Sequence, residues 1–249
     1  MKNFLLLVGI LTACNQTPEQ FIFHQIAAPA TTPPAIPEES TSNGFNVVEK
    51  NDLFEFHYSW SIEAALIPQL VKRLYMNMEE DRAELIALTE KAKSDPVAYY
   101  NSFTEYTTSG QSTRLLSLRI DNNIYTDGAR GDYNINALLW DRKTATGVEA
   151  ADLFAKTSDM SQLLTQRWCA GLAGDRDMGG CPVLDAVTII PTDKNGNGRF
   201  ETLVLILVTP TPAYARASYV RSEVELTITP DLIAALKPDY RDSFEVDQP

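Results

Sequence analysis

The segment that most limits the possible folds is TLVLILV at residues 202–208, which is apolar at almost every position. A strand with one solvated face alternates apolar and polar residues, whereas a strand covered on both faces is apolar throughout. We therefore expect 202–208 to be a central strand. The β-rich run VTIIP at 187–191 comes shortly before it. The short polar segment between the two runs predicts a hairpin.

Alternating patterns elsewhere predict further strands at residues 114–125, 133–141 and 222–228. LFEFHYSW at 53–60 also alternates, with Phe54, Phe56 and Tyr58 on one face. We expect 133–141 to pair with 114–125 as a hairpin.

Helical spacing of apolar residues predicts a long helix that begins near Pro68 and ends by 94–96, and a second helix around 159–172. Thr229-Pro230-Asp231 predicts the start of a last helix, with the threonine as its N-cap. Strands joined by hairpins around a few helices indicate an α+β fold. We expect a mostly antiparallel sheet packed with a few helices, as two sub-lobes in one body.

The first residues, MKNFLLLVGILTAC, predict a lipoprotein signal. One lysine precedes a short apolar run, and Leu11-Thr12-Ala13-Cys14 fits the lipobox of bacterial lipoproteins. We expect residues 1–13 to be the signal peptide, Cys14 to carry acyl chains such as palmitate, and 14–44 to be a proline-rich tether. The folded domain is then 45–249. The alternative is a plain secretory signal that happens to contain a cysteine.

These features predict a protein anchored by lipid in the bacterial cell envelope. Asn15 stands where an aspartate would indicate inner-membrane retention, which favours the outer membrane, facing the periplasm. Beyond the inner membrane the surroundings are oxidising. We therefore expect the two other cysteines, Cys169 and Cys181, to form a disulfide.

The charge balance limits the partners. The chain has 33 acidic and 21 basic residues, a formal net charge of −12. Nucleic acid and anionic lipid headgroups repel an acidic surface, so we expect no nucleic-acid partner. A basic protein would be attracted.

The sequence gives little support for catalysis. It has two histidines, His24 in the expected tether and His57 in an expected strand. Zinc hydrolases need clustered ligands, and a serine-histidine-aspartate triad needs a well-placed imidazole. We expect a non-catalytic protein. A glycan-acting enzyme that uses a pair of acids stays as an alternative.

The segment DKNGNGRFE at 193–201 has the spacing of a calcium loop. Asp193, Asn195 and Asn197 fall at positions 1, 3 and 5, and Glu201 falls at position 9. The acid expected at position 12 is absent, because Val204 stands there. The segment predicts either a weak Ca²⁺ site, with a dissociation constant of order 10⁻⁴–10⁻³ M, or a tight hairpin turn built on its two Asn-Gly pairs. We favour the turn.

The segment YTDGARGDYN at 125–134 is richer in glycine, charge and tyrosine than a bare turn needs. Glycines let a backbone approach a partner, and tyrosines provide contact area. We take Tyr125, Asp127, Arg130 and Tyr133 as candidate partner-binding residues.

The stretch at 125–154, which begins with this segment, resembles the RsiV/PdaC-type extracytoplasmic domain family. The resemblance covers about residues 45–245, including FEFHYSW and ALKPDYRDSFE (235–245). Its most specific positions are Tyr125, Gly128, Ala129 and Gly131 in the loop, Asp141, Thr146 and Gly147 in a turn, and Asp152, Leu153 and Phe154. Two positions depart from the family pattern, with Asp127 in place of a glycine and Arg130 in place of a histidine.

The resemblance implies an α+β fold and a role in the cell envelope. In RsiV this domain binds lysozyme, and in PdaC it accompanies a peptidoglycan-deacetylase domain. We therefore expect this chain to bind a cell-wall-related partner, either a lysozyme-like protein or a peptidoglycan fragment. The alternative is a calcium-stabilised structural or assembly factor of the envelope.

Overall fold

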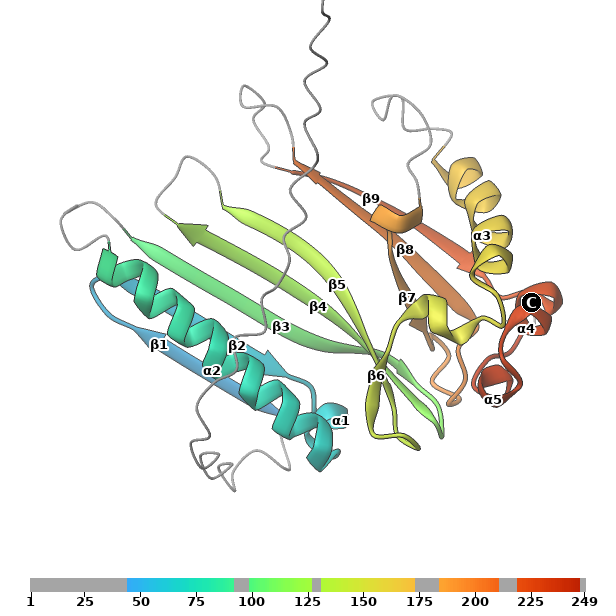
Figure 1. The fold of residues 1–249 in the computed structure, drawn as a ribbon, viewed down its shortest axis with the longest axis horizontal. Helices are drawn as coiled ribbons and strands as arrows, with labels where there is room; N and C mark the ends of the chain where they lie inside the picture. The colour runs from blue at the N-terminus through green and yellow to red at the C-terminus, as the bar shows by residue number, and fades with distance from the viewer. Residues whose placement is uncertain (1–43, 92–98, 127–130, 173–183, 211–218, 247–249) are drawn as a thin grey trace, which may run out of the picture. The chain divides into compact units, whose positions relative to one another are not determined.

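The computed structural model describes residues 44–91, 99–126, 131–172, 184–210 and 219–246. The elements, in chain order, are β1 (Phe45–Lys50), β2 (Phe54–Trp60), α1 (Ile62–Ala65), α2 (Pro68–Lys91), β3 (Tyr100–Gln111), β4 (Leu115–Thr126), β5 (Asp132–Asp141), β6 (Thr146–Val148), the 3-10 helix η2 (Ala150–Leu153), α3 (Thr157–Gly171), the 3-10 helix η4 (Leu184–Ala186), β7 (Thr188–Thr192), β8 (Thr202–Pro210), β9 (Tyr219–Thr227), α4 (Pro230–Ala235) and α5 (Pro238–Arg241) (Figure 1). All belong to one compact unit of the chain, residues 36–249.

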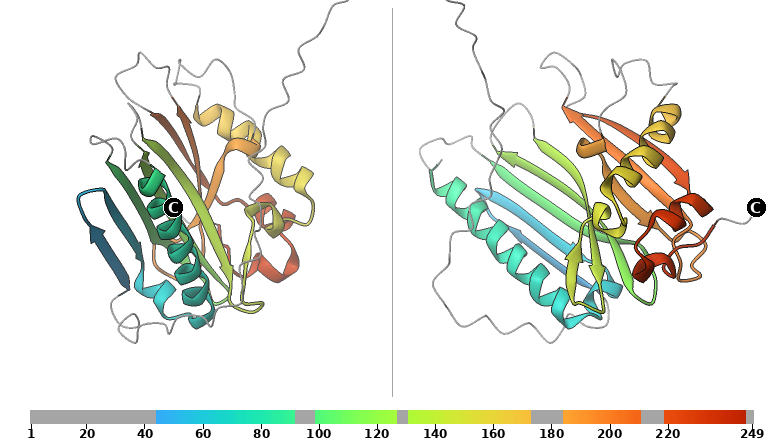
Figure 2. Two further views of the ribbon diagram at one scale, coloured as in Figure 1. Left: turned by 60° about the vertical axis from the view of Figure 1, so that its left-hand side comes forward. Right: turned by 45° about the vertical axis from the view of Figure 1, so that its right-hand side comes forward.

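The larger sheet has six strands in the order β1-β2-β3-β4-β5-β6. Its neighbours pair antiparallel except β2 and β3, which are parallel. Parallel neighbours need a long crossover connection, and α1 and α2 provide it. Helix α2 lies along the sheet (Figures 1 and 2). It buries Leu70, Leu74 and Met78 in the same core as Phe56 and Tyr58 of β2.

Strand β3 is a central strand that the apolar pattern alone did not predict. It alternates buried and more exposed positions along YNSFTEYTTSGQ, but two of the buried positions are Ser102 and Thr104. Small hydroxyl side chains on a buried face conceal the alternation that identifies a strand.

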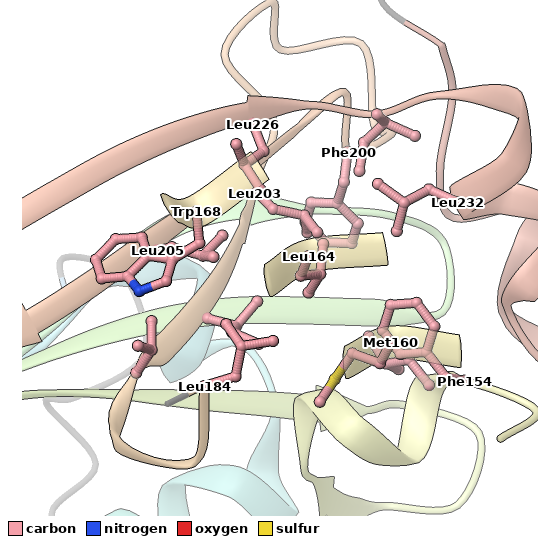
Figure 3. Close-up of a cluster of buried hydrophobic side chains, with 14 of the residues drawn as sticks. Phe154, Met160, Leu164, Trp168, Leu184, Phe200, Leu203, Leu205, Leu226 and Leu232 are labelled. Carbon is pink, nitrogen blue, oxygen red and sulfur yellow. The ribbon is translucent and has the colours of Figure 1, made fainter. Parts of the chain in front are cut away.

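The smaller sheet is an antiparallel meander, β7-β8-β9, with β8 in the middle as expected for TLVLILV. Leu203 and Leu205 belong to the core that includes Trp168 of α3 (Figure 3). Leu207 belongs to the same core. Val204 and Ile206, on the opposite face of β8, pack with Ile135 of β5. Strand β8 is therefore apolar throughout because both of its faces are covered.

Side chains from the two sheets pack in a common core. Leu115 of β4 and Leu139 of β5 belong to the same core as the smaller sheet. The hydroxyl of Thr188 in β7 donates a hydrogen bond to the Ile135 carbonyl at 2.7 Å, and the Asp193 amide donates to the Ser109 carbonyl at 3.1 Å. The α+β class with mostly antiparallel strand pairing is confirmed, and the structure adds a second, smaller sheet.

The last predicted helix begins where expected. The Leu232 amide donates to the Thr229 hydroxyl at 3.5 Å, and Pro230 is the first residue of α4. Within the described ranges, no helix has both the length and the apolar character needed to cross a membrane.

Candidate functional site

The predicted hairpin of residues 114–141 is present, because β4 and β5 pair antiparallel from Leu115–Asp141 to Ile124–Asp132. Of its four candidate contact residues, Asp127 and Arg130 lie outside the described residues, whereas Tyr125 and Tyr133 are described and half-buried. Tyr133 lies opposite Asn123 in the register. Tyr125, two residues after Asn123, therefore shares a sheet face with Tyr133.

That face is the one covered by the smaller sheet. Tyr133 and Ala137 pack against a buried cluster that contains Ile190 and Val204 of the smaller sheet. The structure thus brings the two tyrosines to one face, at the end of the hairpin that leads into the loop.

An ion pair between Arg119 and Asp121 lies next to Tyr133 at this end of the hairpin. Arg119 donates through Nε and Nη2 to the two carboxylate oxygens of Asp121, at 2.6 and 2.8 Å, and the Tyr133 hydroxyl donates to Asp121 Oδ1 at 2.9 Å. Burial alone would raise the pKa of Asp121, but the hydrogen bonds from Arg119 and Tyr133 outweigh it, and the pKa is lowered. Asp121 is therefore a charged anchor for Tyr133.

Tyr219, at the start of β9, is a member of this group that the sequence did not reveal. Its ring meets that of Tyr133 edge-on, with the centroids 6.2 Å apart. Its hydroxyl lies within hydrogen-bonding distance of the Gly131 carbonyl and of Asp132 Oδ1. We call Arg119, Asp121, Tyr133 and Tyr219 the tyrosine cluster. It joins the hairpin to the smaller sheet.

The turn motif that carries the family resemblance has a structural role. Asp141 is fully buried, and its Oδ2 accepts hydrogen bonds from Arg114 Nε at 3.0 Å and Nη2 at 2.8 Å. Its Oδ1 accepts from the Lys143 and Thr144 amides at 2.8 and 3.4 Å, which holds the turn between β5 and β6. Burial would raise the pKa of Asp141, but these hydrogen bonds lower it.

The C-terminal stretch ALKPDYRDSFE contacts the same group. The Arg114 guanidinium lies over the Tyr240 ring, 4.5 Å from its centroid, and pairs with Asp239 at 3.1 Å. The Tyr240 hydroxyl reaches Asp141 Oδ2 at 3.3 Å. Two stretches that resemble the family, about 100 residues apart in the sequence, thus meet at one buried carboxylate. The hydrogen bonds of Asp141 with Arg114 and Tyr240 therefore connect the start of β4, the end of β5 and the C-terminal segment.

The 193–201 segment forms the predicted hairpin turn between β7 and β8, closed by the pair Thr192–Thr202. Asp193 Oδ1 accepts from the Gly196 and Asn197 amides at 2.8 and 3.2 Å, and its Oδ2 accepts from the Gly198 amide at 3.0 Å. Gly196 and Gly198 have positive φ angles of 70° and 85°, which explains the glycines. In the described part of the chain, no group of three or more His, Cys, Asp or Glu side chains is arranged to hold a metal ion.

His57 is a surface strand residue. Its Nε2 lies 2.7 Å from Glu55 Oε1, and its ring is tilted against that of Phe103. Hydrogen bonds from Lys50, then His57 and Tyr99, lower the pKa of Glu55 to about 2.

The cysteines were also candidate sites. Cys169 lies on α3, half-buried against the core of the smaller sheet. Its expected partner Cys181 and the expected lipidation site Cys14 lie outside the described residues. The disulfide and the lipid anchor stay predictions.

Fold and site together define an α+β protein in which a six-stranded and a three-stranded sheet share a core and meet at a tyrosine-rich hairpin end. No family model matches the sequence, and no curated protein matches it.

Solved structures of DUF3298 family proteins are similar to this one. A DUF3298 family protein from Pseudomonas aeruginosa PAO1 aligns with a TM-score of 0.51 and 13% identity, over 81% of this chain and 94% of that chain. A member of the family from Bacteroides fragilis NCTC 9343 aligns with a TM-score of 0.41 and 20% identity, over 78% of this chain and 92% of that one. The first likeness shows a shared fold.

Proposed function

We propose that this chain is a non-catalytic lipoprotein of the bacterial cell envelope, whose domain at 45–249 binds a basic, lysozyme-like protein. The acyl chains on Cys14 would hold it in the envelope, with the outer membrane facing the periplasm as its expected place. The resemblance to RsiV-type domains supports this class of partner.

The observation that carries the proposal is the tyrosine cluster at the base of the β4–β5 hairpin. The Tyr133 hydroxyl donates to Asp121, which is itself paired with Arg119, and the Tyr133 ring meets the Tyr219 ring edge-on. A tyrosine that is already ordered loses little side-chain entropy on binding, so a rigid base favours affinity. Tyr125 shares that face of the hairpin, and the candidate residues Asp127 and Arg130 come next along the sequence.

Charge supports a basic partner. The net charge of −12 would attract a protein of high isoelectric point and accelerate encounter. Attraction of this kind weakens with salt, whereas the contacts of a specific interface keep binding saturable.

A binding titration tests the proposal. Soluble residues 45–249, which contain every described helix and strand, are titrated with a C-type lysozyme at low and at physiological salt. We expect saturable binding at micromolar concentration or tighter, weaker at the higher salt. Tyr125→Ala and Arg130→Ala should each weaken it by about tenfold, the size of an interface contact worth ~1.4 kcal/mol.

Matched variants far from the hairpin are the controls. Met76→Ala removes an exposed apolar side chain of α2, and Lys156→Ala removes an exposed positive charge before α3. Both should bind like the wild type. Binding that never saturates would indicate charge attraction alone. Absence of binding at both salt concentrations would refute the lysozyme proposal. If a peptidoglycan fragment bound instead, the ligand would be a glycan and not a protein.

The lipid anchor is tested separately. Cys14→Ala should shift the chain from the membrane fraction to the soluble envelope fraction and abolish labelling by a palmitate analogue. Retention in the membrane fraction with undiminished labelling would contradict lipidation at Cys14.

A further inference from the structure

Glu201 has a buried carboxylate oxygen to which none of the described residues donates a hydrogen bond. Its side chain is 4% exposed, at the last position before β8. Oε1 accepts a hydrogen bond from the Lys194 amide at 2.7 Å. Oε2 is buried and has no hydrogen-bond partner among the described residues. A buried carboxylate oxygen of this kind is unfavourable unless a donor or a cation meets it.

The segment that Glu201 closes is rich in oxygen ligands. The side-chain oxygens of Asp193, Asn195 and Asn197 all accept hydrogen bonds from amides of the same loop. A carboxylate or amide oxygen has two lone pairs, so an oxygen that accepts one such bond can still face a cation. In Asp193 that oxygen is Oδ2, which accepts only from the Gly198 amide, whereas Oδ1 accepts from two amides. With the Arg199 carbonyl and Glu201, the loop offers only oxygen ligands, the kind that Ca²⁺ takes in a flexible geometry.

The calcium-loop pattern lacks an acid at position 12. The fold, however, brings a third acid, Glu245, to the side of this loop. Phe244, in the segment after α5, forms an isolated parallel β-bridge with Phe200. The Phe200 amide donates to the Ser243 carbonyl at 2.9 Å, and the Glu245 amide donates to the Phe200 carbonyl at 3.0 Å. This backbone pairing holds Glu245 beside the loop.

Glu245 orients the two asparagines. Its Oε1 accepts hydrogen bonds from Asn195 Nδ2, at 3.1 Å, and from Asn197 Nδ2. A charged carboxylate only accepts, so it selects the amide nitrogens and turns the amide oxygens away from itself. Those oxygens then accept from the Asn197 and Arg199 amides, at 2.9 Å each, on the loop side. Asn195, Asn197, Arg199 and Glu245 line an open depression, which gives solvent access to the loop.

We propose that residues 193–201 form a calcium site, with Asp193, Asn195, Asn197 and Glu201 as side-chain ligands and Glu245 as a positioning residue. The site uses two carboxylates, two amides and a carbonyl, and it is therefore weak, with a dissociation constant of order 10⁻⁴–10⁻³ M. It ties the β7–β8 hairpin to the C-terminal segment. This site is independent of the function proposed above.

The test uses the full chain, dialysed against a chelator and then titrated with CaCl₂ or MgCl₂ while binding heat and melting temperature are measured. We expect saturable Ca²⁺ binding, a rise of about 3–10 °C in melting temperature at 10 mM Ca²⁺, and a smaller response to Mg²⁺. Glu201→Gln should abolish the rise. In chelator this variant should be about as stable as the wild type, because its side-chain oxygen can still accept from the Lys194 amide.

Two further variants keep the result interpretable. Glu245→Gln should weaken Ca²⁺ binding about tenfold without abolishing it, as loss of a positioning residue does. Glu149→Gln removes an exposed acid far from this loop in the sequence and should respond like the wild type. Absence of saturable binding up to 10 mM, an equal response to Mg²⁺, or an equal loss in Glu149→Gln would each overturn the proposal.

Discussion

Asp141 shows how one residue can connect distant parts of the chain. It lies at the end of β5, yet its carboxylate is bonded to Arg114 from the start of β4 and to Tyr240 from the C-terminal region. Its lowered pKa means that the charged form stabilises the fold above the ordinary pKa of an aspartate, and that this stabilisation is lost as the pH falls. The charge at this position is therefore a structural requirement at neutral pH.

We predict that Asp141→Ala lowers the free energy of unfolding by about 3–5 kcal/mol, because it leaves the partly buried Arg114 without its main partner. Urea unfolding at pH 7 measures the loss. Asp231→Ala, which removes an exposed aspartate, is the control and should cost less than about 1 kcal/mol. A comparable loss in both variants would show that the buried network of Asp141 stabilises the fold no more than an exposed aspartate does.

Asp81 of α2 is a residue whose charge opposes folding. Burial, and then the neighbouring Glu84 and Glu80, raise its pKa to about 6. The folded state therefore binds a proton more tightly than the unfolded state, and stability falls as the pH rises from about 4 to about 6. Above that range the full penalty is present.

We predict that Asp81→Asn stabilises the protein at pH 7 by about 1–2 kcal/mol and has no effect below pH 4. Denaturant titrations at several pH values give the difference directly. Glu84→Gln, at an exposed position of the same helix, should give a smaller gain. A gain of the same size at every pH would contradict the titration of Asp81 as its cause.

At the scale of elements, β3 meets the β7–β8 turn through a glycine. The register of β3 against β4 shifts between Thr108 and Gly110. A Cβ at Gly110 would lie 2.5 Å from the Asp193 amide nitrogen and 2.7 Å from the Asp193 Cβ. The nearest obstacle is backbone, which cannot rotate away, so the larger sheet and this turn require glycine here.

We predict that Gly110→Ala lowers the free energy of unfolding by about 2–3 kcal/mol, the upper part of the range for overpacking. Gly196→Ala is a matched control, because open space surrounds Gly196 and only its positive φ opposes a side chain. It should cost about 1 kcal/mol through the left-handed backbone alone. If the two variants lost equal stability, the contact with Asp193 would not explain the glycine.

At the scale of the whole folded unit, the two sheets share a core, and this should make unfolding cooperative. Trp60 and Trp140 lie in the core beneath α2, whereas Trp168 lies in the core of the smaller sheet. Leu115 and Leu139 connect the sheets, because β4 and β5 place residues in both cores. Loss of one sheet would expose apolar surface of the other.

We therefore predict a single unfolding transition reported equally by both cores. Trp168→Phe leaves fluorescence from the core beneath α2, and the double variant Trp60→Phe with Trp140→Phe leaves fluorescence from the other core. Each curve is compared with circular dichroism of the same variant, and its two midpoints should coincide. The indole nitrogens of all three tryptophans are buried without a partner in the described structure, so replacement by phenylalanine leaves no hydrogen-bond acceptor unpaired. Separate midpoints within one variant would show that the sheets unfold independently.

Periodicity predicted the elements whose buried faces are apolar. Helix α2, strands β2, β4, β5 and β8, and the cap of α4 were all expected near their observed positions. Strand β3 was missed because serine and threonine occupy part of its buried face. Tyr219 was missed as a site residue because a strand pattern identifies a face but not the tertiary neighbour on that face.

The sequence by itself determined the α+β class, the central place of β8 and the Asp193 turn, since each depends on the spacing of neighbouring residues. Only the tertiary structure decided that Asp141 accepts hydrogen bonds from Arg114 and Tyr240. It also decided that the ring of Tyr133 contacts that of Tyr219, and that Glu245 lies beside Asn195 and Asn197. These contacts join residues far apart in the chain. Local sequence determines the conformation of each segment, whereas long-range partners depend on which faces the folded chain brings together.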